Sequence, residues 1–164
     1  MRRMMQFAGD PTEPAWVAVN DGVMGGLSIG SAAVVDGQLH FSGMLSLANN
    51  GGFSSVRARG ACYDLGQAIE MVLRVCGDGR DYQLRLATDA SVDGKPVSYG
   101  ATFSTQAGQW QIVHVGLDTL TPSLRGTPLG GPPFEPSSVR EIGLLIADRR
   151  EGPFRLAVDW IGVE

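Results

Sequence analysis

The sequence predicts an all-β protein, a β-sandwich of the jelly-roll type. Apolar residues alternate with polar ones along most of the chain, and 23 Gly and 9 Pro in 164 residues supply frequent turns. Helix signals are scarce. The one capping-box match, Ser138 to Glu141, precedes a short β-branched run and predicts at most one helical turn. About nine short strands without alternating helices are typical of two packed antiparallel sheets.

The best supported hairpin turns at Asp78-Gly79, a two-residue type I′ signal. Folding the chain there pairs residues 71–75 with 82–86 and places Leu73 opposite Leu84. One face of this hairpin is apolar and the other mostly polar, as a half-buried pair of strands requires.

Two more hairpins are expected earlier in the chain. A turn at Asp36-Gly37 places Val34 opposite Leu39, apolar with apolar. Asn49–Gly52 supplies residues that readily take positive φ, and a hairpin there directs Leu45 toward the core.

Strands are also expected in the rest of the chain, interrupted by one long loop. They are predicted at Trp16–Asn20, Tyr99–Ser104, Trp110–Leu117, Ile142–Ala147 and Phe154–Ile161. In the last of these, alternation predicts one apolar face made of Phe154, Leu156, Val158 and Trp160. Residues 116–138 are rich in Pro and Gly without periodicity, and their apolar residues predict an ordered loop packed across one sheet.

Length and charge narrow the class of protein. We expect one domain spanning residues 1–164, since this length buries a substantial core. The 13 basic and 17 acidic residues give a net charge of −4, which argues against a nucleic-acid partner. There is no signal-peptide core and no apolar stretch of bilayer length, so membrane insertion is not expected and the cytoplasm is the default location.

The motifs of catalysis and metal binding are weak, so we expect no enzyme and no cofactor. Gly26–Gly30 matches the G-x-S-x-G of a nucleophile elbow, but a predicted hairpin follows it where the elbow needs a helix. Cys62 and Cys76 fit no metal spacing and are expected as free, buried thiols. A calcium ion at a loop stays open, although no EF-hand spacing supports one.

Three blocks of sequence carry a resemblance to a known family. They are W-x-x-x-N-D-G-V-M-G-G-x-S at 16–28, N-N-G-G-F-S-S-V-R at 49–57 and G-D-G-R-x-Y at 77–82. In this order and spacing they resemble the complex I intermediate-associated protein 30 family. Further agreement lies in Trp110-Gln111, Leu124–Gly126, Ile142–Asp148 and Gly152–Leu156, so the resemblance covers about residues 16–161.

The resemblance implies a galactose-binding-like jelly roll related to carbohydrate-binding modules of glycoside hydrolases. In mitochondrial members it also implies a chaperone-like role in assembling NADH:ubiquinone oxidoreductase. The chain resembles the bare domain of a bacterial relative, because it has neither a transit peptide nor a long extension. The implied partners are subunits of the respiratory complex.

Three functions are therefore weighed: a protein-binding assembly factor, a carbohydrate-binding module and, resting only on the elbow match, a hydrolase. The residues expected to bind the partner or ligand are Asn20, Asp21, Arg57, Arg74, Asp78, Arg80, Arg85, Trp110 and Arg125. Arg57, Arg74 and Arg85 are expected on one face, flanked by the 116–138 loop. A functional Arg57 is expected in a concavity near Asn20, Asp21 or Arg80, whereas a merely structural Arg57 is expected away from them.

Asn20 and Asp21 also have a structural interpretation. Either side chain could cap free backbone N–H groups in a tight crossover between the sheets. Gly25-Gly26 would then allow the close approach of two backbone segments.

Overall fold

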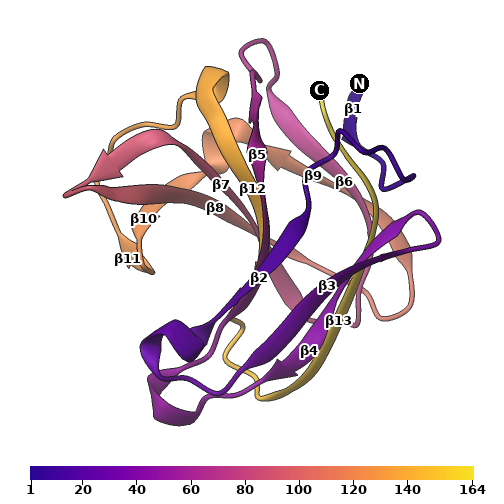
Figure 1. Cartoon of the computed structure of the whole chain (residues 1–164), viewed down its shortest axis with the longest axis vertical. Helices are drawn as coiled ribbons and strands as arrows, with labels where there is room; N and C mark the ends of the chain where they lie inside the picture. The colour runs from indigo at the N-terminus through magenta and orange to yellow at the C-terminus, as the bar shows by residue number, and fades with distance from the viewer.

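Two antiparallel sheets pack face to face in the computed structural model of the chain (Figure 1). The structure describes the backbone of residues 1–164 and all side chains except those of Val23, Met24 and Ala61. Sheet A has the order β3-β4-β13-β6-β9, with β1 paired to β13. Its strands are β1 (Arg2–Met5), β3 (Ile29–Val35), β4 (Gln38–Leu45), β6 (Glu70–Cys76), β9 (Trp110–Gly116) and β13 (Gly152–Val163).

Sheet B has seven strands in the order β11-β10-β8-β7-β12-β5-β2. They are β2 (Trp16–Asn20), β5 (Ser54–Tyr63), β7 (Asp81–Val92), β8 (Lys95–Ser104), β10 (Thr121–Leu124), β11 (Thr127–Pro128) and β12 (Val139–Ile146). The predicted all-β sandwich is confirmed.

The core lies between the two sheets and is dominated by large side chains from both. Phe41 of β4 packs edge-on against Phe154 of β13 at 4.9 Å between ring centroids, and Tyr82 of β7 reaches Phe41 from the other sheet at 6.2 Å. Phe41 and Tyr82 are fully buried. Each such burial stabilises the fold by roughly 1.5–3 kcal/mol.

The predicted hairpin at Asp78-Gly79 is wrong, although its apolar face is right. β6 and β7 belong to different sheets: β6 pairs with β13 and β9, and β7 pairs with β12 and β8. Leu73 and Leu84 are both buried in the same core, but they lie on strands of different sheets and are not partners along a ladder. Alternation identifies the buried face of a strand and leaves its hydrogen-bonded neighbours undetermined.

Of the other two predicted hairpins, one is confirmed and one is wrong. Asp36-Gly37 closes the β3–β4 hairpin with Val34 opposite Leu39, as predicted, and both turn residues have positive φ (51° and 73°). Asn49–Gly52 also contains positive φ angles, but it carries the chain from β4 of sheet A to β5 of sheet B. The third hairpin is therefore wrong, because its turn residues join two sheets.

All five further strands are present, and one of them breaks its predicted alternation. β13 has a bulge that places Val158 opposite Val75 but Trp160 opposite Arg74. The extra residue turns Trp160 to the outer face of sheet A. There the Arg3 guanidinium lies 4.9 Å from the Trp160 ring, and Ile161 takes its place in the core.

Residues 116–138 are ordered, but they contain two short strands where the sequence predicted only a loop. β10 and β11 within this segment extend sheet B beyond β8. Phe134 then packs on Tyr99 with ring centroids 5.4 Å apart, and the Tyr99 hydroxyl donates to the Pro132 carbonyl at 2.9 Å. The segment thus completes one edge of the sheet.

The described helices are four short 3-10 turns, η1 (Asp21–Met24), η2 (Ala48–Asn50), η3 (Leu117–Thr119) and η4 (Pro136–Ser138). η4 ends at Ser138, the first residue of the capping-box match, and β12 begins at Val139, so Ser138 starts no helix. None of the helices that the structure describes has the length and apolar composition needed to cross a membrane.

Candidate functional site

The Asp21 carboxylate is the centre of a buried hydrogen-bond cluster between the sheets. Asp21 is fully buried at the start of η1. Its Oδ1 accepts from the Ser28 backbone N–H at 2.9 Å, and its Oδ2 accepts from the Ser28 hydroxyl at 2.6 Å. Oδ2 also accepts from the backbone N–H groups of Gly52 at 2.7 Å and Phe53 at 3.3 Å. One side chain thereby joins two of the three sequence blocks that carry the resemblance.

The glycines of these blocks make room for that carboxylate. A Cβ at Gly26 would lie 2.3 Å from the Asp21 Cγ, and a Cβ at Gly51 would lie 2.6 Å from Asp21 Oδ2. Real side chains cannot approach so closely. The capping interpretation of Asp21 therefore holds, and the buried Ser28 hydroxyl is bound within the same cluster.

Burial acts to raise the pKa of the Asp21 carboxyl, but the hydrogen bonds from Ser28, Gly52 and Phe53 outweigh it and lower the pKa below its usual range. The carboxylate therefore stays ionised in the folded protein at neutral pH.

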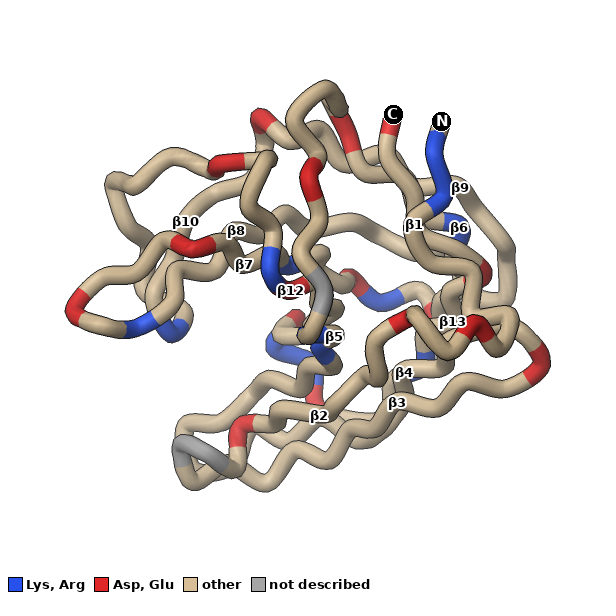
Figure 2. The backbone as a smooth tube through the Cα atoms, turned by 45° about the horizontal axis from the view of Figure 1, so that its top comes forward, with Lys and Arg blue, Asp and Glu red and all other residues tan. Residues whose placement is uncertain are grey.

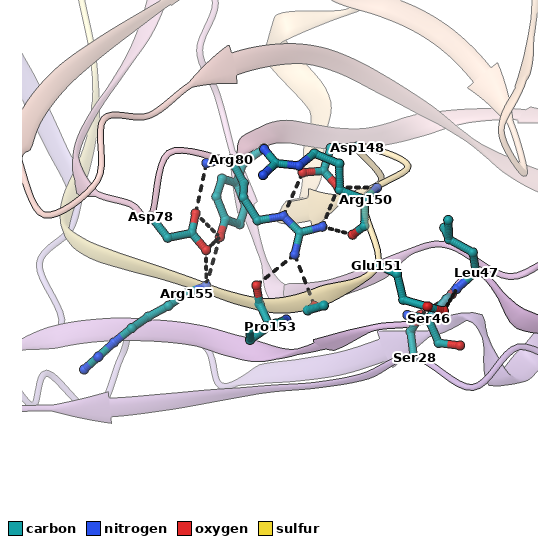
Figure 3. Close-up of polar contacts among 12 residues, drawn as sticks. Ser28, Ser46, Leu47, Asp78, Arg80, Asp148, Arg150, Glu151, Pro153 and Arg155 are labelled. Atoms are coloured by element: carbon teal, nitrogen blue, oxygen red, sulfur yellow. Dashed lines mark hydrogen bonds and ion pairs between the residues drawn. The ribbon is translucent and has the colours of Figure 1, made fainter.

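A second buried network surrounds the Arg80 guanidinium (Figure 3). Arg80 Nε donates to Asp148 Oδ2 at 2.8 Å and Nη2 to Asp148 Oδ1 at 2.6 Å, a bidentate pair in which both side chains are more than nine-tenths buried. Nη1 donates to the carbonyls of Gly152 and Pro153, and Nη2 also to that of Arg150. The pair anchors the β6–β7 crossover to the segment between β12 and β13.

Asp78 organises the other side of the same crossover. Its carboxylate accepts from the Tyr82 hydroxyl at 3.1 Å, from Arg80 N–H at 3.1 Å and from Arg155 N–H at 2.8 Å. Burial, and then the Asp78 carboxylate, raise the pKa of Tyr82. The polar atoms of Asp78 and Arg80 are engaged within the chain, so we leave both residues out of the proposed binding face.

Stability is expected to fall in acid because of two of these carboxylates. Arg80 and the Arg150 backbone N–H lower the pKa of Asp148 against the effect of burial, and hydrogen bonds do the same for Asp21. A lowered folded-state pKa gives stability that is complete above the unfolded value of about 3.9 and is lost as pH falls through the folded value.

Urea unfolding at a series of pH values tests this expectation. The free energy of unfolding should decrease below about pH 4, and Asp21→Asn should flatten the decrease. A wild-type stability that does not change between pH 5 and pH 3 would contradict it.

One row of residues runs across the outer face of sheet B with an unusual alternation of arginine and glycine. Each member is the register partner of the next on successive strands from β2 to β10. We call it the arginine row. It consists of Val17, Arg57, Gly143, Arg85, Gly100 and Thr121. In Figure 2, several Lys and Arg segments lie where β5 and β12 run together.

The glycines leave space for the arginines to lie along the sheet. A Cβ at Gly100 would be 2.2 Å from Arg85 Nη1, and a Cβ at Gly143 would be 3.4 Å from the Arg57 side chain. Arg85 Nη2 donates to the Ser123 hydroxyl at 3.0 Å. Both arginines are half-buried.

Charge is poorly balanced along the row. Burial lowers the pKa of Arg57 and of Arg85, and for Arg85 the nearby Arg57 lowers it further. Glu141 Oε1 lies 3.8 Å from Arg57 Nε, and Glu141 Oε2 pairs with Arg59 Nε. Among the described side chains, no carboxylate pairs with Arg85.

The remaining predicted residues lie elsewhere. Arg74 is on sheet A, where it lies 4.6 Å from the Trp110 ring and pairs with Asp159 at 2.9 Å, so the single face expected for three arginines is divided between the sheets. Asn20 accepts from Ser54 and donates to Gly30 of sheet A, away from Arg57. No hydrogen bond or ion pair joins Arg57 to Asn20, Asp21 or Arg80, so this criterion does not mark Arg57 as functional, and any case for it rests on its register neighbours in the arginine row.

Arg125 is exposed in the two-residue turn between β10 and β11. It has a φ of 49°, and Gly126 beside it also has a positive φ. The turn lies at the edge of sheet B, at the far end from β2.

One group of described residues could hold a metal ion. Ligand atoms of Glu70, His114 and Glu164 lie within 4.8 Å of one another, and His114 Nδ1 is 2.8 Å from a Glu70 oxygen. His114 also lines a hollow of about 500 Å³ between the edges of β8 and β9. Cys62 and Cys76 are free thiols, but Cys62 is exposed rather than buried.

Two features of these sites were absent from the predicted residue set. Asp148 lay inside a quoted block but had no assigned partner, because its pairing with Arg80 spans 68 positions. Gly143 and Gly100 gave no signal, since their role follows only from strand register. The order of strands in sheet B was the missing information.

The sequence profile of the family described as Complex I intermediate-associated protein 30 matches residues 5–158. A mouse (Mus musculus) relative, "Complex I intermediate-associated protein 30, mitochondrial", is 27% identical over 187 residues, which cover 99% of this chain and 56% of the relative. The chain thus spans about half the length of that relative.

Solved structures with the same fold are carbohydrate-binding modules and domains of larger enzymes. A family 11 module from Clostridium thermocellum in complex with a β-1,3-1,4-mixed-linked tetrasaccharide superposes with a TM-score of 0.71 at 11% identity, over 99% of this chain and 94% of the module. An agarase, AgWH50C, superposes with a TM-score of 0.60 at 14% identity, over 97% of this chain and 24% of the enzyme. At these identities the likeness shows the fold alone.

Proposed function

Because the chain belongs to the complex I intermediate-associated protein 30 family, we propose that it is a non-catalytic, protein-binding factor in the assembly of NADH:ubiquinone oxidoreductase. The observation that carries the proposal is the arginine row. A partner that covers the row would supply the carboxylate that Arg85 lacks among the described side chains, and a closer carboxylate for Arg57, whose Nε lies 3.8 Å from a Glu141 oxygen.

The face around the row suits a protein partner. Arginine is enriched at interfaces because its planar fork pairs with carboxylates and its stem buries apolar area. Most of the side chains that flank the two arginines are small or polar, and Val19, Leu145 and Arg59 are the exceptions. The flanking positions are Val19, Ser55, Leu145, Gln83 and Thr102 on one side, and Arg59, Glu141, Ala87, Ser98 and Ser123 on the other.

Carbohydrate binding is the second candidate, and the fold shared with carbohydrate-binding modules favours it. Ligand pockets for such molecules are lined largely by aromatic and apolar side chains with a few polar groups. The row and its two flanks include no aromatic residue among the described side chains. Trp110 is 38% exposed, but it lies on sheet A. We therefore rank protein binding first.

Deleting the gene in the native host is expected to reduce the amount of assembled NADH:ubiquinone oxidoreductase, because its subunits would lose an assembly partner. Native gel electrophoresis and NADH oxidation by isolated membranes measure the loss. Re-expression of the chain should restore both.

Unchanged complex levels in the deletion strain would contradict the proposal. Binding of the purified chain to a soluble β-1,3-1,4-glucan, lost on Trp110→Ala, would favour the carbohydrate candidate instead.

A further inference from the structure

We propose that the arginine row docks an acidic segment of the protein partner, whose Asp or Glu carboxylates pair with Arg57 and Arg85. The inference rests on the proposed function and adds to it the location of the site and the chemistry of the partner. Four observations lead to this assignment: charge, space, register and the character of the surrounding face.

Arg85 is a half-buried cation next to a second cation, and no carboxylate among the described side chains pairs with it. A charge that loses water without gaining an opposite charge costs stability. By contrast, Arg80, which is more deeply buried than Arg85, has a bidentate carboxylate partner. An incoming carboxylate would neutralise Arg85 as the Asp148 carboxylate neutralises Arg80.

The space around the guanidinium groups suits such a ligand. Gly143 lies between the two arginines in the register, and Gly100 lies on the far side of Arg85. Because neither glycine has a side chain, these two positions do not block the approach of a carboxylate to the guanidinium groups. Arg57 and Arg85 flank one strand, so their Cα atoms are roughly 10 Å apart, or two strand spacings.

That spacing indicates what kind of segment fits. Side chains two residues apart on an extended segment point to the same side at about 6.5–7 Å. The long, flexible arginine stems can close the remaining difference over Gly143. A segment with acidic residues two apart, or a run of them, can therefore reach both forks at once.

The rest of the molecule favours a short acidic protein segment over a long polyanion. The two arginines form a local positive patch on a chain whose net charge is −4, so a long polyanion such as a nucleic acid would extend beyond the patch into a repulsive field. A short segment touches only the row and its flanks. The Gln83 side chain lies beside Arg85, where its oxygen accepts from Arg85 Nη1, and its amide N–H group can donate to a further acceptor of the segment.

Fluorescence anisotropy with a labelled octaglutamate peptide tests the proposal on the full chain at low salt. The double variant Arg57→Gln/Arg85→Gln is expected to bind about tenfold or more weakly, equivalent to 1.4 kcal/mol or more, since two charge-assisted contacts are lost. Arg57→Lys/Arg85→Lys keeps the charge without the fork and should bind with intermediate affinity. Arg140→Gln removes one positive charge from an exposed pair with Asp89 on the same sheet and should bind like the wild type, whereas Arg85→Gln alone, which removes the same single charge, should bind more weakly.

Thermal unfolding of the same variants separates binding from a structural role. Because Arg85 is an unneutralised cation, Arg85→Gln should leave the melting temperature unchanged or raise it while it weakens the peptide complex. Wild-type affinity in the double variant, equal losses in the Arg140→Gln control, or a lowered melting temperature for Arg85→Gln would each overturn the proposal. The gene deletion tests the assembly role independently, so the two can fail separately.

Discussion

Replacing Arg80 by glutamine is expected to lower the free energy of unfolding by about 3–5 kcal/mol, the largest effect of any single substitution considered. The change leaves the Asp148 carboxylate buried without its bidentate partner, and breaking a buried ion pair on one side has a cost of this order. It also removes donors from the carbonyls of Gly152 and Pro153.

Urea unfolding at pH 7 measures this loss, and a fall in melting temperature of about 10 °C should accompany it. Arg155→Gln is the matched control, because the Arg155 side chain is exposed and points away from the network (Figure 3). A loss below about 1 kcal/mol for Arg80→Gln, or equal losses for both variants, would show that the pair does not hold the crossover in place.

Asp21→Asn is expected to lower the free energy of unfolding by about 3 kcal/mol. The amide has nearly the shape of the carboxylate, so no cavity opens, but its NH₂ group must face N–H donors that the second oxygen accepted. Gly26 and Gly51 pack tightly against this side chain, so the amide has no room to turn away.

The control for this substitution is Asp36→Asn, in an exposed turn with a positive φ that asparagine also tolerates. Urea midpoints for both variants and the wild type decide the result. Equal midpoints for Asp21→Asn and the wild type would mean that the cluster does not depend on the charge.

The sequence predicted which residues are buried better than which strands are neighbours. Leu73 and Leu84 were both correctly assigned to the core, yet their strands belong to different sheets. Alternation reports the environment of one strand, whereas pairing depends on contacts between distant segments. The β13 bulge shows the same limit, because one inserted residue moved Trp160 to the outer face without altering the apolar pattern.

For the candidate site, the sequence predicted which face of its strand each arginine lies on, but not which strands are neighbours. Arg57 and Arg85 were expected on a common outer face and are on one, since each alternates with buried residues on its own strand. Arg74 follows the same pattern but belongs to the other sheet. The role of Gly143 and Gly100 depends wholly on register, which the sequence of either strand does not contain.

Affinity purification with three forms of the chain as bait tests the central claim most directly. The wild type and Arg140→Gln should each enrich the same subunits of NADH:ubiquinone oxidoreductase from the native host. Arg57→Gln/Arg85→Gln should recover about tenfold less of them at equal bait, because the partner's carboxylates lose both forks. Equal recovery by all three baits, or no recovery of these subunits by the wild type, would contradict the account.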